Sequence, residues 1–214
     1  MKIEKLHEFH DLEFSQAWSD KFKPTPPRLE LFDTILAEIQ KISSPTIRVL
    51  ELGIGPGYLA AHILRKHSGI LYEGLDYATP MLEIAAKRNI AHKDRLFFTQ
   101  TDLTSTNWGS QIQNQPDVIV STWALHDLFS QDNIFKVYQI AHKILPKGGV
   151  LLNGDFIKPE NSPFEYEGGR IKPSVHLTLL KKAGFQSASI IKELEKNVMK
   201  PTTANNYSCF KAVK

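Results

Sequence analysis

The segment from Ile47 to Leu59, with the sequence I-R-V-L-E-L-G-I-G-P-G-Y-L, decides the fold that we expect for this chain. Its first half is a short apolar run with β-branched residues, which is typical of a strand buried on both faces within a parallel sheet. Three glycines follow, and glycine lets the backbone turn tightly and lets a ligand approach where a Cβ atom would collide. From Tyr58 onward the apolar spacing becomes helical. Strand, glycine turn and helix in succession predict a cofactor-binding crevice.

The spacing of Gly53, Gly55 and Gly57 argues against a dinucleotide as the ligand. The dinucleotide fingerprint G-x-G-x-x-G needs its third glycine where Tyr58 stands. Glu51 also precedes the first glycine, and a carboxylate there would repel a pyrophosphate. The same carboxylate is well placed to bind a cationic group such as the ammonium of an amino acid.

The stretch Glu51-Leu-Gly53-Ile-Gly55-Pro-Gly57 resembles the first motif, E/D-x-G-x-G-x-G, of the class I S-adenosylmethionine-dependent methyltransferases. The resemblance covers roughly residues 45–214. It implies a Rossmann-like α/β fold, with a doubly wound, mostly parallel seven-stranded sheet of order 3-2-1-4-5-7-6. The last strand would be antiparallel, and helices would cover both faces. The implied cofactor is S-adenosylmethionine, with S-adenosylhomocysteine as the product.

The remainder of the chain alternates strands and helices up to a fifth strand, which is the pattern of a parallel sheet covered on both faces. Helices are predicted within 1–23 and at 28–42, 58–66, 81–89, 131–145 and 174–182, with Thr79 as the N-cap of the fourth. Strands are predicted at 47–52, 70–76, 95–101, 116–121, 150–156, 185–194 and 207–213, with a hairpin-type connection around 201–206. We expect a single domain over 1–214, made of a helical cap (1–45), a cofactor-binding core (46–156) and a C-terminal part (157–214) that supplies a loop lid, a helix and two strands.

The amino-acid composition limits the classes of protein to which this chain can belong. The chain has 214 residues, of which 42% are hydrophobic and 23% charged, as in ordinary soluble domains. A net charge of +3 is too small to argue for nucleic acid or a membrane surface as a partner. There is no signal-peptide pattern and no apolar run of about 18–20 residues. The single cysteine excludes an intramolecular disulfide. We therefore expect a cytoplasmic protein, monomeric or homodimeric, without nucleic-acid or membrane partners.

Polar residues follow each of the first four predicted strands, and parallel strands bring such residues to one edge of the sheet. The resemblance implies that Asp76 binds the ribose hydroxyls, that Asp102 lies near the exocyclic amine of adenine, and that the ammonium lies near Glu51. It also implies roles for Leu103, through its amide, for Tyr77 and Met81 as walls of the adenine site, and for Ser121 and Trp123 beside the methionine. An acid after a strand is also a common turn former, and a Trp beyond a strand end is often a core residue. The repeated placement of acids at the same strand ends favours a ligand site.

The chemistry of methyl transfer asks mainly for alignment, since the sulfonium methyl is already activated. An oxygen or nitrogen nucleophile also needs a base for its proton, and His126 in S-T-W-A-L-H-D-L is the best candidate. A packing role for His126 is the alternative. The chain lacks the D/N-P-P-Y/F motif of enzymes that methylate the amino groups of DNA bases or glutamine. No trio of metal ligands is apparent, so no metal is expected.

Two additions around the core are predicted to bind the acceptor and to form a lid. One is the aromatic N-terminal region with Trp18 and Arg28, and the other is the loop 157–171 with Tyr166 and Arg170. The arginines would suit a carboxylate or a phosphate, although single arginines are often merely solvated. The sequence thus predicts methyl transfer from S-adenosylmethionine to oxygen or nitrogen of a small-molecule acceptor. A non-catalytic S-adenosylmethionine-binding module and a nicotinamide-dependent oxidoreductase are the alternatives, and Glu51 argues against the latter.

Overall fold

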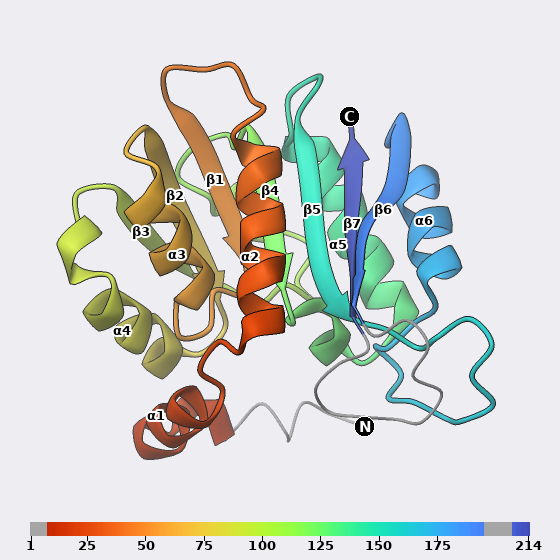
Figure 1. Cartoon of the computed structure of the whole chain (residues 1–214), viewed down its shortest axis with the longest axis horizontal. Coiled ribbons are helices and arrows are strands. Elements are labelled where there is room, and N and C mark those ends of the chain that lie inside the picture. Colours follow the sequence, from red (N-terminus) through yellow and green to blue (C-terminus); the bar gives the residue numbers. More distant parts are fainter. Residues whose placement is uncertain (1–7, 195–206) are drawn as a thin grey trace.

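A seven-stranded sheet forms the centre of the structure, which is a computed structural model describing residues 8–194 and 207–214 (Figure 1). Its strand order is β3-β2-β1-β4-β5-β7-β6. Strands β1 to β5 pair in parallel, and β7 is antiparallel to both β5 and β6. The predicted fold class and strand order are therefore confirmed, while the predicted hairpin connection at 201–206 lies outside the described residues.

The elements follow the predicted pattern, with ends that differ by a few residues. The strands are β1 (Ile47–Leu52), β2 (Ile70–Asp76), β3 (Leu96–Gln100), β4 (Val118–Thr122), β5 (Val150–Phe156), β6 (Ser187–Leu194) and β7 (Tyr207–Val213). The helices are α1 (Leu12–Lys21), α2 (Pro26–Ile39), α3 (Tyr58–Lys66), α4 (Thr79–Arg88), α5 (Gln131–Ile144) and α6 (Pro173–Lys182). Short 3-10 helices are η2 (Glu8–His10), η3 (Ile90–His92), η4 (Trp108–Ser110) and η5 (Leu125–Leu128).

One predicted helix cap is wrong. Thr79 is the first residue of α4, and the N-cap is Ala78. The reason is the side chain of Asp76, whose Oδ1 accepts a hydrogen bond from the Ala78 amide at 3.0 Å. This contact forms a turn directly after β2 and begins the helix one residue earlier than the Thr-Pro pair suggests.

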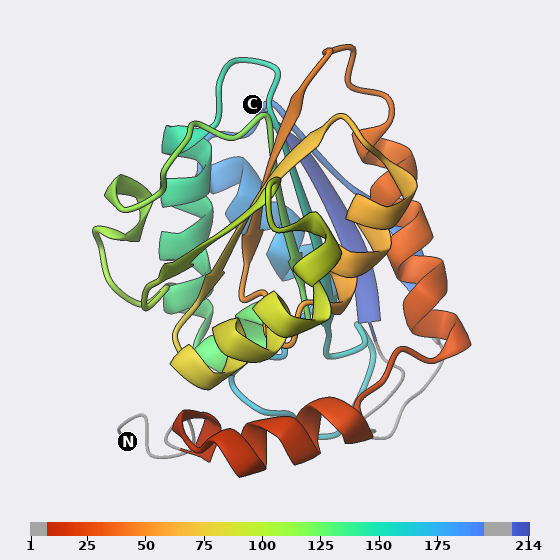
Figure 2. The ribbon, with the colours of Figure 1, turned by 90° about the vertical axis from the view of Figure 1, so that its left-hand side faces the viewer.

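Helices cover both faces of the sheet, and each face has its own hydrophobic core (Figures 1 and 2). Helices α2, α3 and α4 cover one face, and α5 and α6 cover the other. Along β1, Ile47 and Val49 enter the first core and Leu50 and Leu52 the second. Both faces of the strand are therefore buried, which explains its nearly continuous apolar sequence. In the described part of the chain, no helix combines the length and the apolar character that crossing a membrane requires.

The carboxyl ends of β1 to β5 meet at one edge of the sheet, and α1 lies across that edge (Figures 1 and 2). Two hydrogen bonds hold α1 there. The Tyr58 hydroxyl donates to the Ser19 carbonyl at 2.9 Å, and Arg88 Nη2 donates to Ser19 Oγ at 3.1 Å. Because Tyr58 begins α3 directly after the glycine turn, α1 is attached to the turn that shapes the sheet edge.

Gly57 closes the glycine turn and has a left-handed backbone, with φ of 76°. A Cβ atom at this position would lie 2.7 Å from Asn89 Nδ2 and 2.9 Å from the Ala85 Cβ. The Asn89 amide also donates to the Gly57 carbonyl at 3.2 Å. Gly57 therefore allows α4 to pack closely against the start of α3.

We predict that Gly57→Ala lowers the free energy of unfolding by about 2–5 kcal/mol, since it adds both backbone strain and overpacking. Gly148→Ala is the matched control, because Gly148 has a similar φ of 79° but no atom within 4 Å of an added Cβ. The control should lose only about 1–2 kcal/mol for the left-handed backbone. Urea denaturation of the two variants measures the difference, and equal losses would contradict the packing role of Gly57.

Candidate active site

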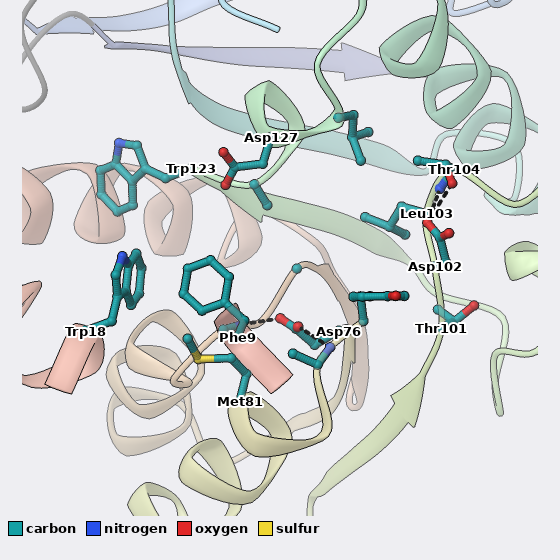
Figure 3. Close-up of a pocket in the computed structure, with 16 residues that line it drawn as sticks. Phe9, Trp18, Asp76, Met81, Thr101, Asp102, Leu103, Thr104, Trp123 and Asp127 are labelled. Carbon is teal, nitrogen blue, oxygen red and sulfur yellow. Dashed lines mark hydrogen bonds between the residues drawn. The ribbon is translucent and has the colours of Figure 1, made fainter. Parts of the chain in front are cut away.

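Two adjoining clefts open at the carboxyl edge of the sheet. The first, which we call the Asp76 cleft, encloses about 820 Å³ including the part open to solvent (Figure 3). The second, the His126 cleft, encloses about 1090 Å³ by the same measure. They share the residues Phe9, Trp18, Gly53, Gly55, Trp123 and Asp127 as walls. A ligand that lies over the glycine turn therefore occupies both clefts.

The glycine turn forms the floor between the clefts. An added Cβ at Gly53 would lie 2.4 Å from the Cβ of Ala124, so this glycine lets the turn approach the segment after β4. Gly55 differs, because no atom lies within 4 Å of an added Cβ. Gly55 is therefore the position at which the backbone is open to a ligand. Gly57 lines neither cleft and packs against α4 instead.

Asp76 lies at the end of β2 and lines the cleft that bears its name. Its Oδ2 accepts a hydrogen bond from the Gly55 amide at 2.8 Å. Burial raises the pKa of the Asp76 carboxyl, although its hydrogen bonds with the Ala78, Gly55 and Tyr77 amides counteract this. A carboxylate has about four acceptor positions, so Asp76 keeps capacity for a ligand's hydroxyl groups.

The walls of the Asp76 cleft combine apolar side chains with a second acid (Figure 3). Tyr77, Met81 and Leu103 all line it. Asp102 Oδ1 accepts hydrogen bonds from the amide and the hydroxyl of Thr104, both at 2.8 Å. Asp102 is thus a turn former, the alternative that the sequence left open, and it also lines the cleft.

Glu51 is a buried acid in the wall of the His126 cleft, with 1% of its surface exposed. The Tyr72 hydroxyl donates to its Oε2 at 2.7 Å. Burial raises the pKa of Glu51 to about 8, against the effect of the Tyr72 hydrogen bond and with a further increase from the charge of Asp76. Glu51 is therefore mostly protonated at neutral pH, and a cation bound beside it would favour its carboxylate form.

Arg28 supplies a positive charge to the cleft that Glu51 lines. Its Nη1 donates to the Phe22 carbonyl at 3.1 Å, and its guanidinium lies 4.6 Å from the centroid of the Trp123 ring. Burial lowers the pKa of Arg28. A carboxyl group that a bound cation would ionise and a guanidinium in the same cleft suit a ligand that carries both an ammonium and a carboxylate.

His126 lies in η5, directly after β4, and forms a pair with Asp155 at the end of β5. Its Nδ1 is 2.7 Å from Asp155 Oδ1, and its Nε2 is 3.4 Å from Asp127 Oδ1. Burial lowers the pKa of His126, but the charge and hydrogen bond of Asp155 together with the charge of Asp127 raise it above the ordinary value. His126 is thus a titratable group in the wall of the second cleft.

Some predicted site residues do not reach a cleft. Ser121 Oγ donates to the Leu52 carbonyl at 2.9 Å and lines neither cleft. Tyr166 also lines neither, and its hydroxyl accepts a hydrogen bond from Ser162 at 3.3 Å. The other predicted acceptor residues do line the His126 cleft; they are Trp18, Arg28 and Arg170.

The clefts also contain residues that were not predicted, including three that carry an aromatic ring or a charge beside the glycine turn and His126. Phe9 and Asp127 line both clefts, and Glu167 lines the second. Sequence signals existed for two of them, because Asp127 follows His126 and Phe9 belongs to the aromatic series that includes Trp18. Among residues 8–194 and 207–214, no cluster of three or more His, Cys, Asp or Glu side chains is arranged to hold a metal ion.

Comparison with known families finds a match over the central part of the chain. Residues 49–149, which include the glycine turn, Asp76 and His126, match the family model of a methyltransferase domain. This stretch, just under half of the chain, is therefore similar to a methyltransferase domain. An uncharacterized methyltransferase of Oceanobacillus iheyensis is 31% identical over 128 residues, which are 59% of this chain and 54% of that protein. A methyltransferase named ungE' from Aspergillus campestris is 26% identical over 121 residues, which are 56% of this chain and 35% of that protein. The chain thus spans about half or less of the length of these relatives.

Solved structures show the same fold at low sequence identity. A structure of PigF with SAH has a TM-score of 0.71 and 15% identity, covering 97% of this chain and 61% of that one. The CurJ carbon methyltransferase has a TM-score of 0.73 and 16% identity, with 96% and 58% covered. Human N-acetylserotonin methyltransferase in complex with SAM has a TM-score of 0.67 and 18% identity, with 95% and 55% covered. Two of these neighbours hold the cofactor that the sequence predicts. N-acetylserotonin methyltransferase holds it as SAM, and PigF holds its product form, SAH.

We predict that Glu51→Gln stabilises the protein at pH 8. The unfolded chain releases the Glu51 proton near pH 4.5 and the folded one near pH 8, so wild-type stability falls as the pH rises through this range. Glutamine has no such proton, so the gain is at least about 1 kcal/mol at pH 8 and shrinks toward pH 4.5. Thermal unfolding at both pH values measures it, with Glu83→Gln on the exposed face of α4 as the control. A gain that is equal at both pH values would contradict the burial of a protonated Glu51.

Proposed function

We propose that the protein transfers the methyl group of S-adenosylmethionine to an oxygen or nitrogen atom of a small-molecule acceptor. The observation that carries this proposal is the joining of the two clefts over the glycine turn. One cleft offers groups for an adenosine, and the other offers groups for an amino acid and a proton acceptor. The methyl group would then lie where the clefts meet, beside Gly53, Gly55, Trp123 and Asp127.

The adenosine would lie in the Asp76 cleft. Asp76 binds a ribose hydroxyl there, since its carboxylate has about four acceptor positions and the Ala78, Gly55 and Tyr77 amides use three of them. Asp102 and the amide of Leu103 lie beside the adenine, with Tyr77 and Met81 as its apolar walls. Apolar walls with a few converging polar groups are what small-molecule sites usually present.

The methionine end would cross the glycine turn into the His126 cleft. Glu51 binds the ammonium and becomes ionised as it does so, because a nearby cation favours its charged form. We propose Arg28 as the partner of the methionine carboxylate rather than of the acceptor, since it shares this cleft with Glu51 and packs on Trp123. The backbone that follows Ser121 lies at the same end of β4.

The acceptor would bind beyond the methyl group, in the part of the His126 cleft that lies next to Trp18 and Arg170. These side chains come from α1 and from the loop 157–171, the two segments expected to form a lid. The aromatic rings around the cleft favour a small acceptor with a flat apolar part; they are Phe9, Trp18, Phe22, Phe32, Tyr58, Trp123 and Phe156. His126 accepts the proton of the nucleophile.

We predict that isothermal titration calorimetry detects binding of S-adenosylmethionine and detects none of NAD at the same concentration. Asp76→Asn should weaken S-adenosylmethionine binding by about 10- to 100-fold, because a charged hydrogen-bond acceptor for the ribose is lost. Asp94→Asn, an exposed substitution before β3, is the control and should bind as the wild type does. Tighter binding of NAD than of S-adenosylmethionine would overturn the proposed cofactor.

A non-catalytic S-adenosylmethionine-binding module is the second candidate, because cofactor binding and catalysis are separable. We predict turnover in a methyl-transfer screen across small hydroxyl and amine acceptors. His126→Ala should reduce that turnover by about 10²-fold or more while leaving cofactor affinity nearly unchanged, since a general base acts on the acceptor. His92→Ala in η3 is the control, because His92 lines neither cleft. Cofactor binding without turnover in any arm of the screen would favour the module.

A further inference from the structure

The buried carboxylate of Asp155 contacts both the ring and the backbone amide of His126. Asp155 Oδ1 is 2.7 Å from His126 Nδ1, and Asp155 Oδ2 accepts a hydrogen bond from the His126 amide at 3.0 Å. Asp155 Oδ1 also accepts a hydrogen bond from the Phe156 amide at 2.8 Å. Only 1% of the Asp155 surface is exposed, so its contacts are with the protein rather than with a ligand. Its position is therefore that of a residue that acts through His126.

These contacts fix which ring nitrogen of His126 carries a proton. A carboxylate has no hydrogen to donate, so Nδ1 must be the donor in its contact with Asp155. In the neutral imidazole the lone pair is then on Nε2. His126 lines the second cleft, and it is Nε2 that lies 3.4 Å from Asp127, a residue shared by both clefts. The free acceptor atom of His126 is thus on the side where the methyl donor and the acceptor would meet.

The backbone of His126 is also held from the other side. A Cβ atom at Gly169 would lie 1.7 Å from the His126 carbonyl oxygen, so the loop 157–171 lies directly against this carbonyl. The ring of His126 meets the ring of Phe156 edge-on, with centroids 4.9 Å apart. His126 is therefore confined between the end of β5, which includes Asp155 and Phe156, and the loop 157–171.

Charged groups surround the ring from each neighbouring element. Asp155 from β5 faces Nδ1, Asp127 from η5 faces Nε2, and Arg170 from the loop adds a positive charge. Glu167 from the same loop lies 3.8 Å from Arg170 Nε and acts on Asp127. When His126 gains a proton, its two ring N–H groups therefore point at two carboxylates, which stabilises the imidazolium.

We propose that Asp155 is the positioning residue for His126 and that the acceptor of this methyltransferase presents a hydroxyl group. This inference rests on the proposed function. A neutral amine attacks with its own lone pair and loses its proton afterwards, whereas a hydroxyl is a weak nucleophile until a base takes its proton. The buried carboxylate of Asp155 directs the Nε2 lone pair of His126 toward the cleft. A hydroxyl acceptor needs such a base to remove its proton.

The step balances in atoms and charge. The hydroxyl proton moves to His126 Nε2, the oxygen forms a bond to the methyl carbon, and the bond between that carbon and the sulfonium sulfur breaks. The sulfur keeps the electron pair and leaves as S-adenosylhomocysteine, and the acceptor leaves as a methyl ether. Asp127, with a side chain 50% exposed, then passes the proton from Nε2 to solvent.

The first experiment is nuclear magnetic resonance of the ¹⁵N-labelled imidazole of His126, which needs neither cofactor nor acceptor. We expect Nδ1 to be protonated and Nε2 unprotonated in the neutral form of the wild-type protein. Asp155→Asn should lower the pKa of His126 by about 1 unit, because it removes the adjacent negative charge. Asp132→Asn, an exposed acid at the start of α5, is the matched control and should leave the His126 titration unchanged.

The wild-type measurement keeps the proposal testable even if Asp155→Asn does not fold. A proton on Nε2 in the neutral form would overturn the positioning role, and so would an unchanged titration in a folded Asp155→Asn variant. Asp127→Asn, at a half-exposed position, gives an independent lowering of the His126 pKa.

The second experiment compares a hydroxyl acceptor with its amine analogue over pH. With the hydroxyl, kcat/KM should rise with pH as His126 loses its proton, and this limb should move to lower pH in Asp155→Asn, with kcat reduced about 10-fold or more. Equal or faster turnover of the amine, unaffected by Asp155→Asn, would overturn the proposal. If S-adenosylmethionine does not bind at all, the proposed function fails, while the resonance experiment still decides whether Asp155 positions His126.

Discussion

The hydrogen bond from the Gly55 amide to the Asp76 carboxylate is the contact on which the site depends. It joins the turn after β1 to the end of β2 and sets the floor shared by the two clefts. Around it, Gly53 lets the turn approach the segment after β4, and Gly57 lets α4 pack against α3. The glycine turn is therefore shaped by packing on two sides and is open to a ligand only at Gly55.

Two ionisable side chains at the sheet edge, Glu51 and Arg28, have uncharged partners within the protein. Glu51 is buried with a tyrosine hydroxyl rather than a cation as its partner, so burial keeps its proton in place. Arg28 packs on aromatic rings and a backbone carbonyl. Such groups cost folding stability, and a ligand of complementary charge would pair with them. This is the usual relation between a preorganised binding site and the stability of its fold.

Sequence patterns predicted the fold well because each signal was local. The strand, the glycines and the helix start lie within Ile47–Leu59, and the acid at the end of β2 follows a clear apolar run. What the sequence did not predict depends on contacts between distant segments. The carboxylate of Asp155 and the ring of His126 are 29 residues apart, and their contact needs the parallel register of β4 and β5. The orientation of the Ser121 side chain could not be predicted either, because its hydroxyl donates a hydrogen bond to the Leu52 carbonyl of the neighbouring strand β1.

The two glycines at 168 and 169 have a consequence for changing what this protein accepts. Added Cβ atoms there would lie 2.5 Å from the Phe129 carbonyl oxygen and 1.7 Å from that of His126, so neither position tolerates a side chain while the loop keeps its place. The flanking residues Glu167 and Arg170 carry side chains into the His126 cleft. A directed-evolution library should therefore leave the glycine pair fixed and randomise its neighbours. The glycine pair would then hold each new loop sequence in the same position beside His126 and Asp155.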